Sequence, residues 1–378
     1  MRLFVILAFL STVTTAAAAE EFKPVIRPGF QLRVDGNSVE TDKAGKDSIA
    51  TGFAIYRARM AVGGDLDENL SFFVRYDVMY PYSSRGDINS DGAVGNLERA
   101  YLEHRPLPGL TLRFGRFPFM AGAIEWDYSS MDQYSPSHYS DLINFPVFVA
   151  TSGVDATYKL GPQSLTLQVL NGVPGLTDLH SGAAVPKADA GKQHGENLTT
   201  AVGFRGNYLD GVVKPIVSYD RFSRVRNGDG AEHDERATYT SIGAGVQVSA
   251  FHFDLDLESD TFAVPAFQYY TWDATTNAAT KIDAKKDVLQ SYVGQLAFNA
   301  TELRLRPFVK VSSEVESVDG KQAATWKRDA LGVEYRPLAY KAFRYHAVLV
   351  DKRDTDESVP VKVRTNVRQY ILGVAAKI

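Results

Sequence analysis

The connections between the predicted strands alternate in length, and this alternation constrains the fold more than any other feature of the sequence. Short turns such as GGDLDEN, RPLPG and LDG alternate with long polar stretches from one end of the chain to the other. Period-two patterning gives sixteen predicted strands, at 27–35, 50–63, 70–80, 96–105, 109–117, 147–159, 164–172, 198–208, 211–222, 237–249, 251–260, 287–299, 301–313, 325–336, 340–351 and 364–377. The long connections are 36–49, 81–95, 118–146, 173–197, 223–236, 261–286, 314–324 and 352–363. The sequence therefore predicts an all-β fold: a 16-stranded antiparallel up-and-down transmembrane β-barrel, with the termini and short turns on one side and long extracellular loops on the other.

The two faces of each predicted strand differ in polarity. In FHFDLDLESD, residues 251–260, the charged side chains share one face, and Phe253, Leu255 and Leu257 share the other. A soluble β-sandwich shows the same alternation, with its apolar face toward a core, so parity alone does not separate the two folds. Most predicted strands reach the ~9–11 residues that a tilted strand needs to cross a bilayer. Strand length and the segregation of long loops to one side favour the membrane barrel.

The N-terminus has the pattern of an export signal. Arg2 precedes the apolar stretch LFVILAFL, and Ala17–Ala19 form a small-residue cleavage site. The predicted organisation is a signal peptide at 1–19 followed by an outer-membrane β-barrel at 20–378. No other segment reaches the ~18–20 apolar residues of a membrane helix. An exported barrel predicts the cell outer membrane of a Gram-negative bacterium, in contact with outer-membrane lipid and lipopolysaccharide.

Composition and motif spacing exclude several function classes. The chain has no cysteine and a net charge of −4, which excludes the basic footprint that nucleic-acid binding usually needs. The seven histidines are scattered without a zinc-binding spacing. Ser137, His138 and Asp141 are close together in SPSHYSD, but the members of a catalytic triad usually come from distant segments. We therefore expect no enzymatic activity.

The stretch DINSDGAVGNLE, residues 87–98, matches the calcium-loop pattern D-x-[DN]-x-[DN]-G-x₅-E. Asp87, Asn89, Asp91 and Glu98 would supply the side-chain oxygens for a structural calcium ion. The flanking residues alternate with period two, whereas an EF-hand needs a helix on each side, so an EF-hand is excluded. A calcium loop between strands and an ordinary polar turn both remain open. No other cofactor is expected.

Two neighbouring stretches resemble the phosphate-selective porin O/P family. They are YRARMAVGGDLDENLSFFVRYDV at 56–78 and LERAYLEHRPLPGLTLRFGRFPF at 97–119, and the close match covers about residues 52–120. The resemblance implies a water-filled channel for passive diffusion of small hydrophilic solutes, with anions, including phosphate, preferred. It also implies a homotrimer and a third loop folded inward as a constriction.

The resemblance implies that basic side chains line the pore. The Arg-x-Arg strand carries Arg57 and Arg59, and the other candidates on water-facing positions are Arg75, Arg113, Arg304, Arg306, Lys310, Arg336 and Arg344. Rings of Arg and Lys favour anions. In the alternative interpretation, these arginines pair with lumen carboxylates such as Asp77 and Glu334 and the wall is neutral overall.

The predicted third loop departs from the family pattern because it is acidic. Residues 117–146 contain no lysine or arginine but include Glu125, Asp127, Asp132 and Asp141. An acidic loop opposite a basic wall would form a general porin with a transverse field, weakly cation-leaning and without a phosphate site. A third alternative is a closed barrel that serves adhesion or scaffolding. A barrel of sixteen strands is too wide to be filled by its own wall side chains, which favours a conducting pore.

Overall fold

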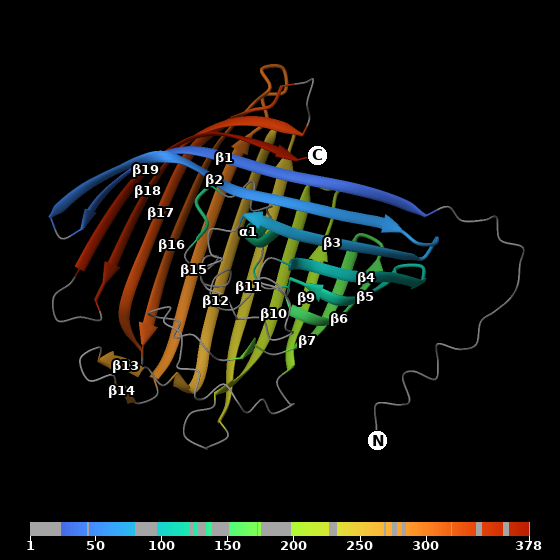
Figure 1. Cartoon of the computed structure of the whole chain (residues 1–378), viewed down its shortest axis with the longest axis horizontal. Helices are drawn as coiled ribbons and strands as arrows, with labels where there is room; N and C mark the ends of the chain where they lie inside the picture. The colour runs from blue at the N-terminus through green and yellow to red at the C-terminus, as the bar shows by residue number, and fades with distance from the viewer. Residues whose placement is uncertain are drawn as a thin grey trace, which may run out of the picture.

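The computed structural model describes residues 24–43, 45–79, 97–118, 120, 122, 124–127, 134–137, 151–171, 173–174, 198–226, 233–267, 270–273, 278–281, 285–318, 320–337, 342–357 and 363–377. These residues form a closed antiparallel β-barrel, in which each strand pairs with its neighbours in chain order and β19 pairs with β1 (Figure 1). The sixteen wall strands are β1 (Val25–Lys43), β2 (Lys46–Asp65), β3 (Leu70–Met79), β4 (Leu97–Leu107), β5 (Leu110–Phe117), β6 (Thr151–Leu160), β7 (Gln163–Asn171), β9 (Leu198–Gly206), β10 (Val213–Arg226), β11 (His233–Val248), β12 (Phe251–Phe267), β15 (Lys285–Phe298), β16 (Leu305–Val318), β17 (Lys321–Tyr335), β18 (Phe343–Asp356) and β19 (Val363–Lys377). The predicted barrel and its number of strands are confirmed.

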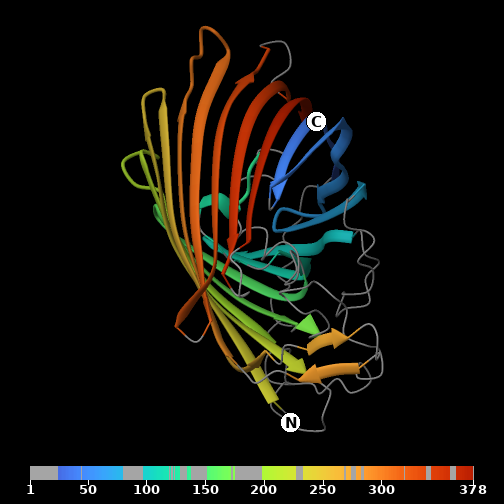
Figure 2. The same ribbon diagram turned by 90° about the vertical axis from the view of Figure 1, so that its left-hand side faces the viewer.

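Four short elements lie outside this ring. The two-residue strand β8 (Val173–Pro174) pairs in parallel with β10, and β13 (Tyr270–Asp273) forms a hairpin with β14 (Ala278–Lys281). Figure 2 shows this hairpin at the end of the barrel opposite to the C-terminus. The fourth element is the short helix α1 (Ile124–Asp127). No helix among the described residues is long and apolar enough to cross a membrane.

Side-chain alternation sets the two surfaces of the wall. On β12, Leu255 and Leu257 are exposed on the outer surface, whereas Asp254 and Asp256 are buried on the inner side. On β16, Val309 is exposed outward, and its neighbour Lys310 is buried against inner groups. Apolar residues outside and charged residues inside are the arrangement of a barrel that faces lipid and encloses water.

Two of the predicted long loops are strands instead. Residues 36–49 continue β1 and β2 to a tight turn at Gly45, which has a φ of 75° and donates its backbone N–H to the Asp42 carboxylate at 3.1 Å. Residues 314–324 likewise continue β16 and β17 to a turn at Gly320, which has a φ of 76°. Glycine adopts this left-handed conformation at little steric cost. Polar side chains dominate these extensions, with only scattered valine and isoleucine residues, so the apolar alternation that marks a strand is weak there.

The predicted strand 301–313 begins later than expected. Thr301–Arg304 form a turn, in which the Arg304 N–H donates to the Thr301 carbonyl at 3.2 Å and Arg304 has a φ of 58°. The strand β16 starts only at Leu305. Arg304 is therefore an exposed turn residue on the short-turn side, and its predicted position on the pore wall is corrected.

The third connection, between β5 and β6, contacts the inner wall of the barrel. The backbone N–H groups of Ile124 and Glu125 donate to the two carboxylate oxygens of Asp256 on β12, at 2.9 and 2.6 Å. The Ser218 hydroxyl on β10 donates to the Gly122 carbonyl at 3.1 Å. Figures 1 and 2 show α1 inside the ring of strands. These contacts hold the start of the third loop against β10–β12.

Candidate functional site: the charged inner wall and the third-loop anchor

A cluster of arginines and carboxylates covers the inner side of β2, β3 and β4. Arg57 Nη1 donates to Asp77 Oδ2 at 2.9 Å, and Arg59 Nε lies 2.7 Å from Asp77 Oδ1 and 2.9 Å from Glu98 Oε2. Arg75 also pairs with Glu98. All five side chains are at most 12% exposed. We call this group, together with Arg99 at 3.8 Å from Glu98, the β2–β4 cluster.

A β-bulge brings Glu98 into this cluster. Arg75 faces Arg99 across the β3–β4 pair, but the next residue, Tyr76, faces Leu97, so Glu98 is the extra residue. Strict alternation would have placed Glu98 on the same side as Leu102, which is 45% exposed on the outer surface. A bulge re-aims one side chain by breaking the alternation. The carboxylate of Glu98 therefore lies among three guanidinium groups.

This position weighs against the predicted role of Glu98 as a calcium ligand, a role that stays a prediction. Its carboxylate is held by the positive charges of Arg59, Arg75 and Arg99. These charges disfavour the binding of a calcium ion at the same carboxylate. The other predicted ligands, Asp87, Asn89 and Asp91, lie outside the described residues, so calcium binding there stays a prediction. Within the described part of the chain, no group of three or more acidic or histidine side chains could hold a metal ion.

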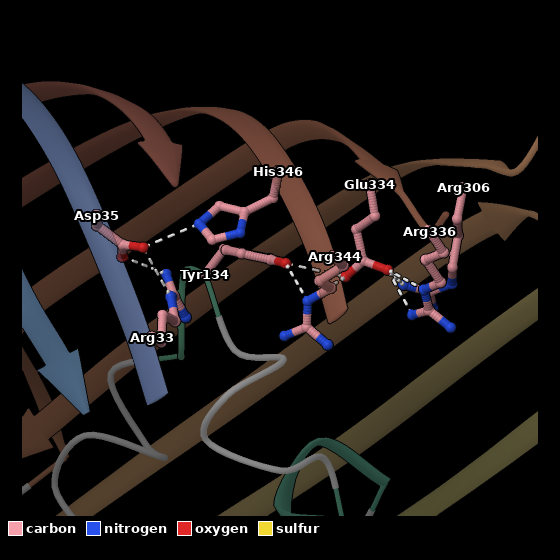
Figure 3. Close-up of polar contacts among 8 residues, drawn as sticks. All are labelled: Arg33, Asp35, Tyr134, Arg306, Glu334, Arg336, Arg344 and His346. Carbon is pink, nitrogen blue, oxygen red and sulfur yellow. Dashed lines mark hydrogen bonds and ion pairs between the residues drawn. The ribbon is translucent and has the colours of Figure 1, made fainter. Parts of the chain in front are cut away.

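A second cluster surrounds Glu334 near the short-turn end of β17. Its carboxylate lies 2.5 Å from Arg336 Nη2, 3.7 Å from Arg306 Nη1 and 3.7 Å from Arg344 Nε. Glu334 itself is fully buried. Figure 3 shows the three arginines converging on this one carboxylate, and we call the four residues the Glu334 cluster.

Both clusters contain more guanidinium groups than carboxylates. The β2–β4 cluster has Arg57, Arg59, Arg75 and Arg99 against Asp77 and Glu98, and the Glu334 cluster has three arginines against one glutamate. The predicted pairing of wall arginines with Asp77 and Glu334 is therefore present. Among the described residues of these clusters, however, the pairing leaves an excess of positive charge.

A cavity of about 760 Å³ connects the two clusters on the short-turn side of the lumen. Its charged lining residues are Arg59, Arg75, Arg336, Arg344 and Lys377, and no carboxylate belongs to the described lining. These residues come from β2, β3, β18, β19 and the position after β17, and together with β1, which contributes Gln31, they span a contiguous arc of the wall. Every charged side chain that an anion meets in the described lining of this cavity is positive.

Tyr134 anchors the third loop to the wall beside the Glu334 cluster. Its hydroxyl donates to Glu334 Oε1 at 3.0 Å and accepts from Arg344 Nε at 3.1 Å. Its ring stacks on Phe308 with centroids 5.4 Å apart and contacts the His346 ring at 4.9 Å. Burial and the neighbouring Glu334 carboxylate raise the pKa of Tyr134 above its ordinary value, so its hydroxyl stays protonated and remains a donor.

A third set of contacts joins the strands at the barrel closure. Arg33 Nη2 lies 2.7 Å from Asp35 Oδ2 on β1, and His346 Nε2 on β18 lies 2.9 Å from Asp35 Oδ1. The guanidinium of Arg33 also lies over the Tyr134 ring, 4.5 Å from its centroid (Figure 3). Gly373 on β19 leaves room for this bond, because a Cβ there would be 2.5 Å from both Asp35 Oδ1 and His346 Nε2. The third loop, β1 and β18 thus meet around Tyr134.

The acidic residue Glu125 of the third loop is neutralised. It is 3% exposed, pairs with Lys310 and accepts the Ser137 backbone N–H at 2.9 Å. Lys310 also donates to the Ser135 carbonyl at 2.7 Å. Glu125 therefore does not face the arginines across open water, as an acidic constriction would require. The Asp127 side chain, Asp132 and Asp141 lie outside the described residues.

The remaining sequence candidates take ordinary positions. Arg113 on β5 donates to Asp155 on β6 at 3.1 Å. Ser137 donates its hydroxyl to Glu125, while His138 and Asp141 lie outside the described residues. The sequence reasoning missed Arg33, Asp35, Tyr134 and His346. Arg33 and Asp35 share the inner parity of a correctly predicted strand, which was a usable signal, whereas a loop tyrosine has no periodic pattern.

Comparison with known proteins matches these features to a family. The family model for phosphate-selective porin O and P matches residues 26–243, more than half of the chain. Similar solved structures include the outer membrane channel DcaP of Acinetobacter baumannii (TM-score 0.62, 12% identity, covering 96% of this chain and 100% of that one). They also include an anion-selective porin from Comamonas acidovorans (0.61, 11%, 94% and 100%) and a trimer form of OmpT from Vibrio cholerae (0.55, 10%, 94% and 99%). At these identities the structures support the fold alone. No curated protein sequence matches the chain.

Family and fold agree with the charged, cavity-bearing lumen described above. The protein is an outer-membrane channel of a Gram-negative bacterium. On the family match, the chain belongs to the phosphate-selective porins O and P.

Proposed function

We propose that the channel carries small hydrophilic solutes by passive diffusion and prefers anions, phosphate among them. The observation that carries this proposal is the cavity of about 760 Å³, whose described charged lining is entirely basic. Arginine side chains attract anions over the whole lumen and bind phosphate oxygens through paired N–H groups. The charge excess of the β2–β4 and Glu334 clusters adds to this attraction.

Carboxylates on another part of the inner wall support a second candidate, a general porin without a phosphate site. Asp220, Asp254, Asp256, Glu314 and Glu316 are buried on the inner side of β10, β12 and β16. Carboxylates on one arc and arginines on the other produce a transverse field that orders water and passes polar solutes of either sign. Carboxylates of this arc have partners of their own: Asp256 holds the third loop, Asp254 pairs with His252, and Glu314 and Glu316 are engaged as well.

Planar-bilayer conductance of the purified protein separates the two candidates. In a potassium chloride gradient, an anion-preferring channel gives a reversal potential on the chloride side, and added phosphate blocks the current at low concentration. A reversal potential near zero or on the potassium side, without phosphate block, would show a general porin. Absence of conductance would favour the closed barrel used for adhesion or scaffolding.

We also propose that the protein assembles as a homotrimer. The resemblance to the porin O and P family supports this, and one structurally similar porin, OmpT of Vibrio cholerae, is described in a trimer form. Light scattering on the detergent-solubilised protein, corrected for bound detergent, tests the proposal. The expected mass is three times that of the mature subunit, whose mass is 41.6 kDa less that of the signal peptide. The mass of a single subunit would exclude the trimer.

A further inference from the structure

Three aromatic rings face inward on adjacent strands of the barrel. Phe73 on β3 and Tyr101 on β4 are direct cross-strand partners with ring centroids 5.7 Å apart. Phe117 on β5 meets Tyr101 edge-on at 6.3 Å. Val74, Leu102 and Phe114, on the opposite parity of the same three strands, are exposed on the outer surface, which fixes the rings on the inner side. We call these three residues the inner aromatic row.

The row is not simply a packed core. Phe117 is fully buried, but Phe73 is only half-buried and lines the same cavity of about 760 Å³ as Arg75 and Arg336. Exposure of an apolar ring to water is unfavourable, and an apolar group that covers the ring removes this cost. Ala61 of β2, also on the inner side, extends the apolar part of the same cavity wall.

Apolar and cationic groups therefore lie side by side in one concave site. The guanidinium of Arg75 follows Phe73 by two residues on the same face of β3. Arg336, whose side chain is 48% exposed, and Lys377 supply reachable positive charge at the same cavity. A cavity of this volume is in the range of sites that hold organic molecules, roughly 300–1,000 Å³, and is much larger than one inorganic phosphate needs.

Resting on the proposed anion preference, we propose that this cavity binds organic anions with a flat apolar body, of which aromatic carboxylates are the chemical class. The carboxylate pairs with the guanidinium group of Arg75, the ring of the solute packs on Phe73, and Arg336 adds positive charge at the same cavity. Ring stacking adds a favourable contact that acetate and inorganic phosphate do not make. The cavity thereby retains aromatic acids longer than small anions on their way through the channel.

Block of the potassium chloride current by benzoate, acetate and phosphate tests the proposal. Benzoate is expected to block at a concentration roughly fivefold lower than acetate, which carries the same charge without the ring. The variant Phe73→Leu keeps an apolar side chain but removes the ring. In this variant, benzoate and acetate should block the current at similar concentrations. The matched control Phe253→Leu makes the same substitution on the outer surface of β12, where Phe253 is 44% exposed, and should preserve the difference.

A charge variant separates the ring contact from the ion pair. Arg336→Gln should weaken benzoate and acetate block by the same factor and leave their ratio unchanged. Equal block by benzoate and acetate in the unmodified protein, or a ratio that survives Phe73→Leu, overturns the proposal. The reversal potential without organic anions reports the proposed anion preference on its own. A chloride-side potential without benzoate preference therefore refutes only the aromatic site, and a potassium-side potential refutes the proposed function.

Discussion

The hydroxyl of Tyr134 donates a 3.0 Å hydrogen bond to Glu334, a residue 200 positions later in the chain. One partner belongs to the third loop and the other to the wall strand β17. The same hydroxyl accepts a hydrogen bond from Arg344, so one side chain of the loop contacts both a carboxylate and a guanidinium group of the wall. Tyr134 thus adds a phenolic oxygen and an aromatic ring to the contacts that hold the third loop, beside the pairing of Glu125 with Lys310 on β16.

Replacing Tyr134 by phenylalanine should loosen the third loop without unfolding the barrel. The change keeps the stacking on Phe308 and removes the two hydrogen bonds, a loss of about 1–3 kcal/mol for a bond to a charged group. Single-channel recordings should show more frequent brief closures at the same open conductance. Tyr345→Phe is the control, because Tyr345 is 48% exposed on the outer surface. Equal closure rates for Tyr134→Phe and the unmodified protein would mean that the hydroxyl does not hold the loop.

Replacing Glu334 by glutamine should increase the preference for anions. The substitution keeps the shape and removes the one negative charge among Arg306, Arg336 and Arg344. The reversal potential in a potassium chloride gradient should move toward the chloride value at low ionic strength, and less so near 1 M salt, where screening is strong. Asp329→Asn, on the same strand but paired with Arg353 and 46% exposed, should leave the potential unchanged. A shift of the reversal potential toward the potassium value would contradict the excess of positive charge in the Glu334 cluster.

Replacing Gly373 by alanine should destabilise the barrel closure. The new Cβ would lie 2.5 Å from Asp35 Oδ1, from His346 Nε2 and from the Val34 backbone oxygen, so both the hydrogen bond between the two side chains and the nearby backbone must shift. We expect a loss of about 1–3 kcal/mol in the free energy of unfolding, measured by urea titration in lipid vesicles. Gly294→Ala is the matched control, because its Cβ would meet only Val311 Cγ2 at an ordinary 3.6 Å. Similar losses for the two variants would show that crowding at Asp35 is not the cause.

Replacing Lys310 by methionine should leave Glu125 buried without its positive partner. Breaking a buried ion pair on one side costs about 3–5 kcal/mol, whereas removing both charges is much less harmful. Limited proteolysis near the third loop and urea unfolding should both show the effect of Lys310→Met. The double variant Lys310→Met with Glu125→Gln should recover most of the lost stability. Additive losses in the double variant would show that the two side chains are not coupled.

Alternation and turn chemistry predicted the strands well but could not predict where the alternation breaks. The charged face of β12 and the inner position of Arg75 follow directly from period two. The bulge at Glu98 does not, because one inserted residue leaves no distinct composition, yet it moves a carboxylate from the outer parity to the β2–β4 cluster. The polar ends of β1 and β2 resemble loops for a related reason, since polar side chains dominate them and the apolar alternation is weak.

The contacts of Tyr134 with the wall could not be predicted from the sequence, for a different reason. Its partners come from β1, β16, β17 and β18, which are distant in the chain and converge only because the sheet closes. Nothing in the residues around 134 indicates which wall positions lie nearby. Arg33 and Asp35 could be assigned to the inner face from their parity, but their contact with His346 depends on the pairing of β1 with β19.

The pairing of β1 with β19 has a consequence for the order in which the channel assembles. The first and last strands of the chain must find each other across more than 300 residues, and contacts between such distant segments form slowly. Tyr134 binds to residues of β17 and β18, which are synthesised late. It also contacts Arg33 on β1, whose edge stays unpaired until β19 is in place. Until the last strand is inserted, the wall around Tyr134 is incomplete. The contacts of Tyr134 with the wall, and with them the final position of this part of the third loop, are therefore complete only when the last strand has paired with β1.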